Sequence, residues 1–439
     1  MSAQTTAPSP STQTSTTSKP EVRAIPLSDD ERSKDSIIRS FQFHASDEDL
    51  ADLKRRVKAT RWPDRETVAD DSQGVQLATM QKLADYWASE YDWRKVEDRL
   101  NAFPNFITNI DGLDIHFIHV RSEHENALPI VITHGWPGSI IEQLKIIAPL
   151  TDPTAFGGSA ADAFHVVIPS MPGYGFSARP TEAGWGPPRI AQGWLTLMKR
   201  LGYDRFLAHG GDWGALMTEI LGVMAPPELV AIHTNMPSTV PPEIYQALRD
   251  GNGPPSGLSA EELRAYERLD LFFTHGLGYA NQMGHRPQTL YGIADSPVGL
   301  AAWFLDHDIL SYRMIARAFD GEPEGLSRDD VLDNITITWL TNTAISGARL
   351  YWEALPRTSP GFGIEKNKAR FFEPFGVSVP TAVSQFPEEL YPVPRSWAEQ
   401  AYPKLLHYGQ QPKGGHFAAF EQPEFLVEEL RAAFKSVRS

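Results

Sequence analysis

One aspartate stands where a sharp strand-to-helix turn could expose its carboxylate as a nucleophile. In Gly210-Gly211-Asp212-Trp213-Gly214, one glycine lies two positions before the aspartate and another lies two positions after it. Such a turn pushes its central residue outward and needs small residues at these two positions, because side chains there would clash. A carboxylate can attack a saturated carbon and form an ester intermediate. Asp212 therefore indicates epoxide opening or carbon–halogen cleavage; the alternative is an aspartate that only caps the following helix.

Two residues near the C-terminus could assist this nucleophile. His416 lies in a Gly-Gly-His-Phe turn, and an imidazole is the side chain best suited to accept a proton near neutral pH. Glu389 lies in a Phe-Pro-Glu-Glu-Leu segment and could orient the His416 ring, with Glu388 as its competitor for that role. The chain order of nucleophile, acid and histidine is that of α/β-hydrolases. The alternative is a purely structural histidine in a glycine turn.

A further glycine-containing turn could stabilise negative charge on a reacting oxygen. His134-Gly135-Trp136-Pro137 follows an apolar run at 129–133. In the α/β-hydrolase fold this loop supplies one backbone N–H group to the oxyanion hole, and the residue after the nucleophile supplies the other. The expected pair is thus the amides of Trp136 and Trp213, although an ordinary glycine–proline turn is the alternative.

The elements around these turns alternate between short apolar runs and helical stretches. Many of the runs end in glycine-rich turns, which is typical of a parallel sheet with crossover helices. The runs lie at 114–120, 129–133, 164–168, 205–208, 229–233, 381–384 and 404–408. Before the first run, Ser46 and Asp92 are positioned to cap helices. Helical stretches such as 260–276 and 334–352 interrupt the alternation late in the chain.

We therefore expect an α/β fold with a mostly parallel central sheet, a helical lid insertion and a helical N-terminal extension. The first twenty residues are rich in Ser, Thr and Pro, which bury too little apolar area to fold. The predicted segments are a disordered tail (1–36), the helical extension (37–110), the first part of the core (111–236), the lid (237–370) and the last part of the core (371–439).

The composition narrows the classes of function. The 439 residues carry a net charge of −15, which disfavours nucleic-acid binding because that requires a basic face. The sequence contains no cysteine, so a thiolate nucleophile, disulfides and cysteine-based metal sites are excluded. It has no apolar run of membrane-spanning length. Its N-terminus lacks a basic stretch followed by an apolar stretch, so we do not expect a secretory signal. We expect a soluble, cytoplasmic protein without a membrane span.

Four motifs together resemble the epoxide hydrolases of the microsomal type, which have an N-terminal extension. They are Arg61-Trp62-Pro63-Asp64, His134-Gly135-Trp136-Pro137-Gly138-Ser139, Gly210-Gly211-Asp212-Trp213-Gly214 and Gly414-Gly415-His416-Phe417. The resemblance extends over roughly 37–435. It implies two lid tyrosines that donate hydrogen bonds to the epoxide oxygen. Tyr279 and Tyr351 match the two lid motifs, whereas other lid tyrosines such as Tyr266 and Tyr291 are expected to serve packing.

The expected reaction converts an epoxide and water to a vicinal diol. Asp212 forms a hydroxyalkyl ester, and water activated by His416 hydrolyses that ester. A small apolar epoxide and water are the expected partners, and no metal or organic cofactor is needed. A homodimer is possible on the sequence alone. Two alternatives remain at this point: a haloalkane dehalogenase, which shares the aspartate turn, and a non-catalytic ligand-binding protein on the same fold.

Overall fold

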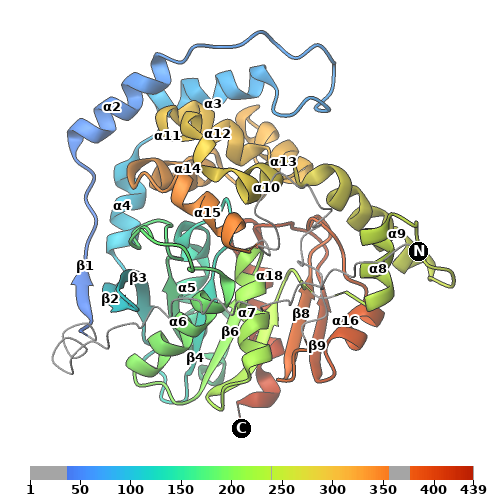
Figure 1. Cartoon of the computed structure of the whole chain (residues 1–439). Coiled ribbons are helices and arrows are strands. Elements are labelled where there is room, and N and C mark those ends of the chain that lie inside the picture. Colours follow the sequence, from blue (N-terminus) through green and yellow to red (C-terminus); the bar gives the residue numbers. More distant parts are fainter. Residues whose placement is uncertain (1–36, 239, 355–375, 439) are drawn as a thin grey trace, which may run out of the picture.

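The computed structural model describes residues 37–238, 240–354 and 376–438, which surround one mixed β-sheet (Figure 1). Within these residues the sheet has nine strands in the order β1-β2-β3-β5-β4-β6-β7-β8-β9. The strands are β1 (Arg39–Phe41), β2 (Asn105–Ile110), β3 (Leu113–Val120), β4 (Leu128–Thr133), β5 (Phe164–Pro169), β6 (Phe206–Gly210), β7 (Leu229–Thr234), β8 (Thr381–Gln385) and β9 (Leu405–Gln410). In the second part of this order, β5, β4, β6, β7, β8 and β9 run parallel to their neighbours. In the first part, β1 pairs with β2, β2 with β3 and β3 with β5, all antiparallel. The predicted mostly parallel sheet is confirmed.

The central strands are buried along their whole length. Every residue of β4, β6 and β8 is buried. A parallel strand covered on both faces needs apolar residues throughout, which explains the continuous apolar runs in the sequence. Helix α7 (Trp213–Met224) packs on β4, β6 and β7, α5 (Leu144–Thr151) packs on β5, and α18 (Pro423–Ala433) packs on β8 and β9. Helix α6 (Pro187–Arg200) lies against α7 and β2.

The N-terminal segment contains the expected helices and also two strands. Its helices are α2 (Asp47–Lys58), α3 (Leu77–Ser89) and α4 (Trp93–Asn101). The predicted caps are present, since Ser46 Oγ accepts a hydrogen bond from Asp49 N and the Asp92 side chain accepts one from Arg94 N. Strands β1 and β2 were not predicted and extend the sheet beyond β3.

A helical region follows β7 and lies over the sheet (Figure 1). Its helices are α8 (Pro242–Asp250), α9 (Ala260–Leu271), α10 (Gly278–His285), α11 (Tyr291–Asp295), α12 (Pro297–Leu305), α13 (Ile309–Phe319), α14 (Arg328–Leu340) and α15 (Ala344–Ala354). Helices α2 and α3 contact α12, and α3 also contacts α13. The N-terminal helices therefore support the lid from outside.

Three details refine the sequence predictions. The stretch 334–352 is not one helix, because the chain turns at 341–343, where Asn342 has a φ of 50°. The predicted tail, 1–36, and the last part of the predicted lid, 355–370, lie outside the described residues. Among the helices of the described part, none has the length and apolarity needed to cross a membrane.

Candidate active site

Asp212 occupies a strained turn between β6 and α7. Its backbone has a φ of 50° and a ψ of −128°, a region that side-chain-bearing residues rarely adopt. The flanking glycines are required sterically. A Cβ at Gly214 would lie 2.0 Å from the carbonyl oxygen of Thr133, and one at Gly210 would lie 2.2 Å from the backbone of Gly214. The fold therefore fixes the Asp212 carboxylate, which is only 7 % exposed, at the carboxyl end of the sheet.

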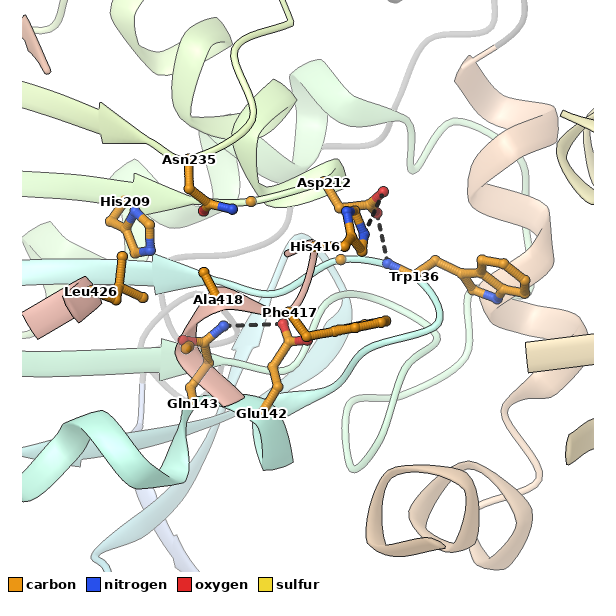
Figure 2. Close-up of a pocket in the computed structure, with 13 residues that line it drawn as sticks. Trp136, Glu142, Gln143, His209, Asp212, Asn235, His416, Phe417, Ala418 and Leu426 are labelled. Carbon is orange, nitrogen blue, oxygen red and sulfur yellow. Dashed lines mark hydrogen bonds and ion pairs between the residues drawn. The ribbon is translucent and has the colours of Figure 1, made fainter. Parts of the chain in front are cut away.

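One oxygen of this carboxylate lies in the predicted oxyanion hole. The Trp136 amide donates a hydrogen bond of 2.8 Å to Asp212 Oδ1 (Figure 2). The loop approaches so closely that a Cβ at Gly135 would lie 2.3 Å from the same oxygen. Trp213, the second expected donor, is the first residue of α7 and directly follows the nucleophile. Asp212 Oδ1 is thus held by the loop after β4, which leaves Oδ2 as the attacking oxygen.

The predicted base lies on the Oδ2 side of Asp212. His416 follows β9, and its Nε2 is 3.6 Å from Asp212 Oδ2. Its Nδ1 donates a 2.6 Å hydrogen bond to Glu389 Oε1. Glu389 is buried and also accepts hydrogen bonds from the amide of Leu390 and the side chain of Asn235. Glu388 is exposed, so the structure pairs His416 with Glu389.

The charges around His416 determine its protonation. Burial lowers the pKa of the imidazole, but the charge and hydrogen bond of Glu389, followed by the charges of Asp212 and Asp308, outweigh burial and raise the pKa to about 10. His416 is therefore an imidazolium at neutral pH while Asp212 is a free carboxylate. His416 can accept a proton from water only after part of the negative charge around it, such as that of Asp212, is removed.

The two predicted tyrosines meet above the oxyanion loop. Tyr279 on α10 stacks on the Trp136 indole with ring centroids 4.8 Å apart, and Tyr351 on α15 meets the same indole edge-on at 5.7 Å. The two phenol rings are 6.0 Å apart. Burial, and after it nearby negative charge that includes Asp212, raises the pKa of Tyr279 well above 10. Burial, followed by the charges of Tyr279 and Asp212, does the same for Tyr351, so both phenols are protonated donors.

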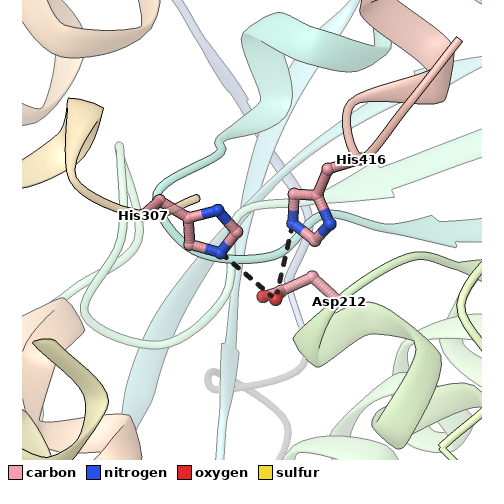
Figure 3. Close-up of side chains that lie close together, drawn as sticks. All are labelled: Asp212, His307 and His416. Carbon is pink, nitrogen blue, oxygen red and sulfur yellow. Dashed lines mark ion pairs between the residues drawn. The ribbon is translucent and has the colours of Figure 1, made fainter. Parts of the chain in front are cut away.

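Two buried groups at the site were missed by the sequence analysis. His307, between α12 and α13, places its Nε2 4.0 Å from Asp212 Oδ2 (Figure 3). The only hint in the sequence is a histidine between two aspartates. Glu142 lines a narrow pocket that is also lined by Asp212 and His416 (Figure 2). Burial raises the pKa of Glu142 to about 8 despite a hydrogen bond from Gln143, so this carboxyl is neutral at pH 7.

An apolar cavity adjoins these polar groups. Most of its lining is apolar. The lining residues are Pro137, Phe304, Leu305, His307, Ser311, Ile315, Leu326, Val331, Asn334, Ile335, Phe417 and Phe420. His307 and Phe417 place it beside the predicted base, because their rings lie 4.5 Å and 4.9 Å from the His416 ring. A small apolar molecule in this cavity would lie beside the catalytic groups.

Three side chains at the site are of types that can ligate a metal ion. One donor atom from each of Asp212, His307 and His416 lies within 4.8 Å of the other two. The atoms are spaced too widely for tetrahedral zinc, however, whose ligand atoms lie about 3.4 Å apart. His307 Nε2 and His416 Nε2 are 4.0 Å and 3.6 Å from Asp212 Oδ2, so the spacing favours an acid-base cluster around the nucleophile.

Comparisons with known proteins agree with this geometry. Residues 38–143 match the family profile "Epoxide hydrolase N terminus", and residues 129–259 match the profile "alpha/beta hydrolase fold". A "Putative epoxide hydrolase" of Stigmatella aurantiaca is 49 % identical over 406 residues, which covers 92 % of this chain and 86 % of that protein. "Epoxide hydrolase 1" of Oryctolagus cuniculus is 35 % identical over 412 residues, covering 90 % and 88 %.

Solved structures show the same likeness. The juvenile hormone epoxide hydrolase of Bombyx mori superimposes with a TM-score of 0.79 at 30 % identity, covering 93 % of this chain and 96 % of the other. The Aspergillus niger epoxide hydrolase gives a TM-score of 0.75 at 32 % identity, covering 92 % and 98 %. The similarity thus extends over the sheet, the lid and the N-terminal segment together.

Proposed function

The chain belongs to the epoxide hydrolase family, and from this membership we propose that it opens its substrate through a covalent ester on Asp212. The observation that carries the proposal is the unequal environment of the two carboxylate oxygens. Oδ1 accepts the Trp136 amide, whereas Oδ2 faces the imidazole of His416. A carboxylate held in this way presents one oxygen for attack and keeps the other in the oxyanion hole.

In the first half of the reaction, Asp212 Oδ2 attacks one ring carbon of the epoxide. The carbon–oxygen bond of the ring breaks, and the leaving oxygen takes a proton from Tyr279 or Tyr351. Both phenols are protonated because burial holds their pKa values well above 10. Hydrogen bonds directed at developing negative charge, in a site closed to water, give the largest share of many enzymatic rate enhancements.

In the second half, water activated by His416 attacks the Asp212 carbonyl carbon. Ester formation removes the negative charge of Asp212, one of the charges that raise the pKa of His416. The imidazole thus becomes a usable base only after the ester exists. Glu389 holds the ring so that Nε2 faces the reacting carboxyl, and the Trp136 amide stabilises the tetrahedral oxyanion. A vicinal diol leaves.

The substrate proposed here is a small apolar epoxide. Apolar side chains supply most of the lining of the cavity beside His307. The lining offers few polar groups to bind a polar substituent, so apolar burial supplies most of the binding energy. Haloalkane cleavage is not favoured, because two buried phenols over Trp136 suit an epoxide oxygen, which needs a proton, better than a halide.

A single-turnover reaction in ¹⁸O-labelled water tests the covalent step. With enzyme in excess over styrene oxide, the label should enter the Asp212 carboxylate before it enters any diol. His416→Gln should form the ester and retain it, as seen by mass spectrometry of the peptide that contains Asp212. His285→Gln, an exposed lid histidine, is the matched control and should turn over normally. Direct labelling of the diol in the first turnover would overturn the proposal.

A further inference from the structure

His307 has the features of a second functional imidazole. It lies on the lid between α12 and α13, and its side chain is only 2 % exposed. Its Nδ1 is 3.1 Å from Asp308 Oδ2, whereas no group of the described residues hydrogen-bonds to its Nε2. The rings of His307 and His416 converge on Asp212 from different sides (Figure 3). A buried polar atom without a hydrogen-bond partner destabilises the fold, and a catalytic role is one reason why such an atom is retained.

Asp308 fixes the direction in which this ring can act. Burial raises the pKa of Asp308, but the hydrogen bond and charge of His307, followed by the charge of His416, outweigh burial and lower the pKa to about 2. The Ser311 amide also donates a 2.7 Å hydrogen bond to Asp308 Oδ1. An ionised carboxylate accepts the Nδ1 proton, so the neutral ring keeps Nε2 as a proton acceptor. Asp308 thus repeats for His307 what Glu389 does for His416.

The proposed reaction leaves a proton on His416 at the moment when a lid tyrosine needs one. After ring opening, Tyr279 or Tyr351 has given up its proton and is a phenolate. At that moment His416 still carries the proton that its pKa of about 10 gives it in the resting enzyme. It cannot accept a proton from water until this proton leaves. One transfer, from the imidazolium of His416 to the phenolate, would restore the acid and free the base.

His307 lies between these two groups. Its ring centroid is 4.5 Å from that of His416 and 5.2 Å from that of Tyr279. One ring nitrogen of each histidine lies within 4.8 Å of the other. The relay therefore needs the two rings to turn toward each other until these nitrogens reach the ~3 Å of a hydrogen bond. The direction of transfer is also defined, because the pKa of Tyr279 lies well above 10. A phenolate at this position therefore draws a proton from either imidazolium.

We propose that His307 is a proton relay that carries a proton from His416 to the phenolate of Tyr279 between the two halves of the reaction. This proposal rests on the proposed covalent mechanism. The His416 Nε2–H bond breaks as His307 Nε2 takes the proton, and the same nitrogen then releases it to the phenolate oxygen. His416 next takes a proton from water as the water oxygen attacks the ester carbon, and gives that proton to the departing diol oxygen. The Asp212 carboxylic acid released by this step then passes its proton to His416, which restores the carboxylate and the imidazolium. The cycle consumes one epoxide and one water, and every protein group regains its starting proton.

His307→Gln tests the relay, because the amide can hydrogen-bond but cannot carry the proton. In wild-type enzyme mixed with excess styrene oxide, the ultraviolet difference absorbance of tyrosinate should be brief, and a pH-indicator dye should show no proton uptake from solution. In His307→Gln the tyrosinate signal should last at least tenfold longer, with uptake of a proton from solution. The ester should decay more slowly by a similar factor. Asp308→Asn should change the same signals in the same direction.

The outcomes separate the relay from other roles. Tyrosinate and ester lifetimes in His307→Gln within twofold of wild type would overturn it, as would slower ring opening with no tyrosinate at all, which indicates a positioning role. A lowered midpoint of thermal unfolding with unchanged signals would also count against it. If His416→Gln retains the ester while His307→Gln behaves as wild type, the relay fails and the covalent mechanism stands. If His416→Gln retains none, the covalent mechanism itself fails.

Discussion

Replacing Asp212 by asparagine should lower the pKa of His416, so that the imidazolium loses its proton at a lower pH than in the wild-type protein. The asparagine keeps a carbonyl oxygen for the Trp136 amide but removes the negative charge, as ester formation does. His416 Nε2 lies 3.6 Å from Asp212 Oδ2, and two unit charges at that distance interact by roughly 4 to 5 kcal/mol at an effective dielectric constant of about 20. This is an upper limit, because the amide dipole and relaxation of the site replace part of the loss.

The expected change is large enough to measure directly. About 1.4 kcal/mol changes an acid dissociation constant tenfold. The acid dissociation constant of His416 should therefore increase by about ten- to a thousandfold in Asp212→Asn. The sign follows from the causes of the shift. Glu389, Asp212 and Asp308 raise the pKa of His416, and removing one of these charges must lower it. The imidazole then loses its proton at a lower pH than in the wild-type protein.

Histidine-selective ¹⁵N labelling and a pH titration by NMR would measure this change. The His416 signals are assigned from the spectrum of His416→Gln, and exposed His285 serves as the internal reference. A His416 titration midpoint that does not move in Asp212→Asn would refute the reasoning. In that case Glu389 and Asp308 alone would set the protonation, and ester formation could not switch the base on.

Four further substitutions have defined outcomes. Tyr279→Phe and Tyr351→Phe should each slow ester formation about 100-fold in single-turnover kinetics while leaving ester hydrolysis unchanged; equal loss in both steps would contradict their role as acids. Glu389→Gln should slow ester hydrolysis by about 10³- to 10⁴-fold, because the imidazole loses its orienting carboxylate, and normal turnover would remove this residue from the mechanism. Gly214→Ala should lower the unfolding temperature, because a Cβ there clashes with the backbone of β4, whereas Gly292→Ala, with nothing within 4 Å, should not.

Local chemistry explains why the nucleophile could be predicted from the sequence. The turn at Asp212 needs small residues at fixed offsets, and that requirement is visible in five consecutive letters. The choice between Glu389 and Glu388 was harder, because both follow the same apolar run. Neighbours in an extended segment point to opposite sides, and only packing shows which side faces the site. The structure buries Glu389 against His416 and leaves Glu388 in solvent.

Strands β1 and β2 were missed because they are short and contain polar residues. β1 is the edge strand and β2 is the strand next to it, and neither is buried along its whole length, so their sequences need not be apolar throughout. A usable signal was nevertheless present. Asp111 and Gly112 both have positive φ values, 51° and 81°, and join β2 to β3 as a two-residue hairpin. An Asp-Gly pair between two alternating segments predicts such a hairpin from sequence.

His307 could not be placed from sequence, for a different reason. Its partner on the same loop, Asp308, is adjacent in the chain, but His416 comes from the loop after the last strand and Tyr279 from another lid helix. Whether a lid histidine faces the nucleophile or the solvent depends on how α12 and α13 pack against α2 and α3. No periodicity within the loop encodes that orientation. The N-terminal helices thereby affect the chemistry without touching the substrate, because they hold the lid loop that brings a second imidazole to Asp212.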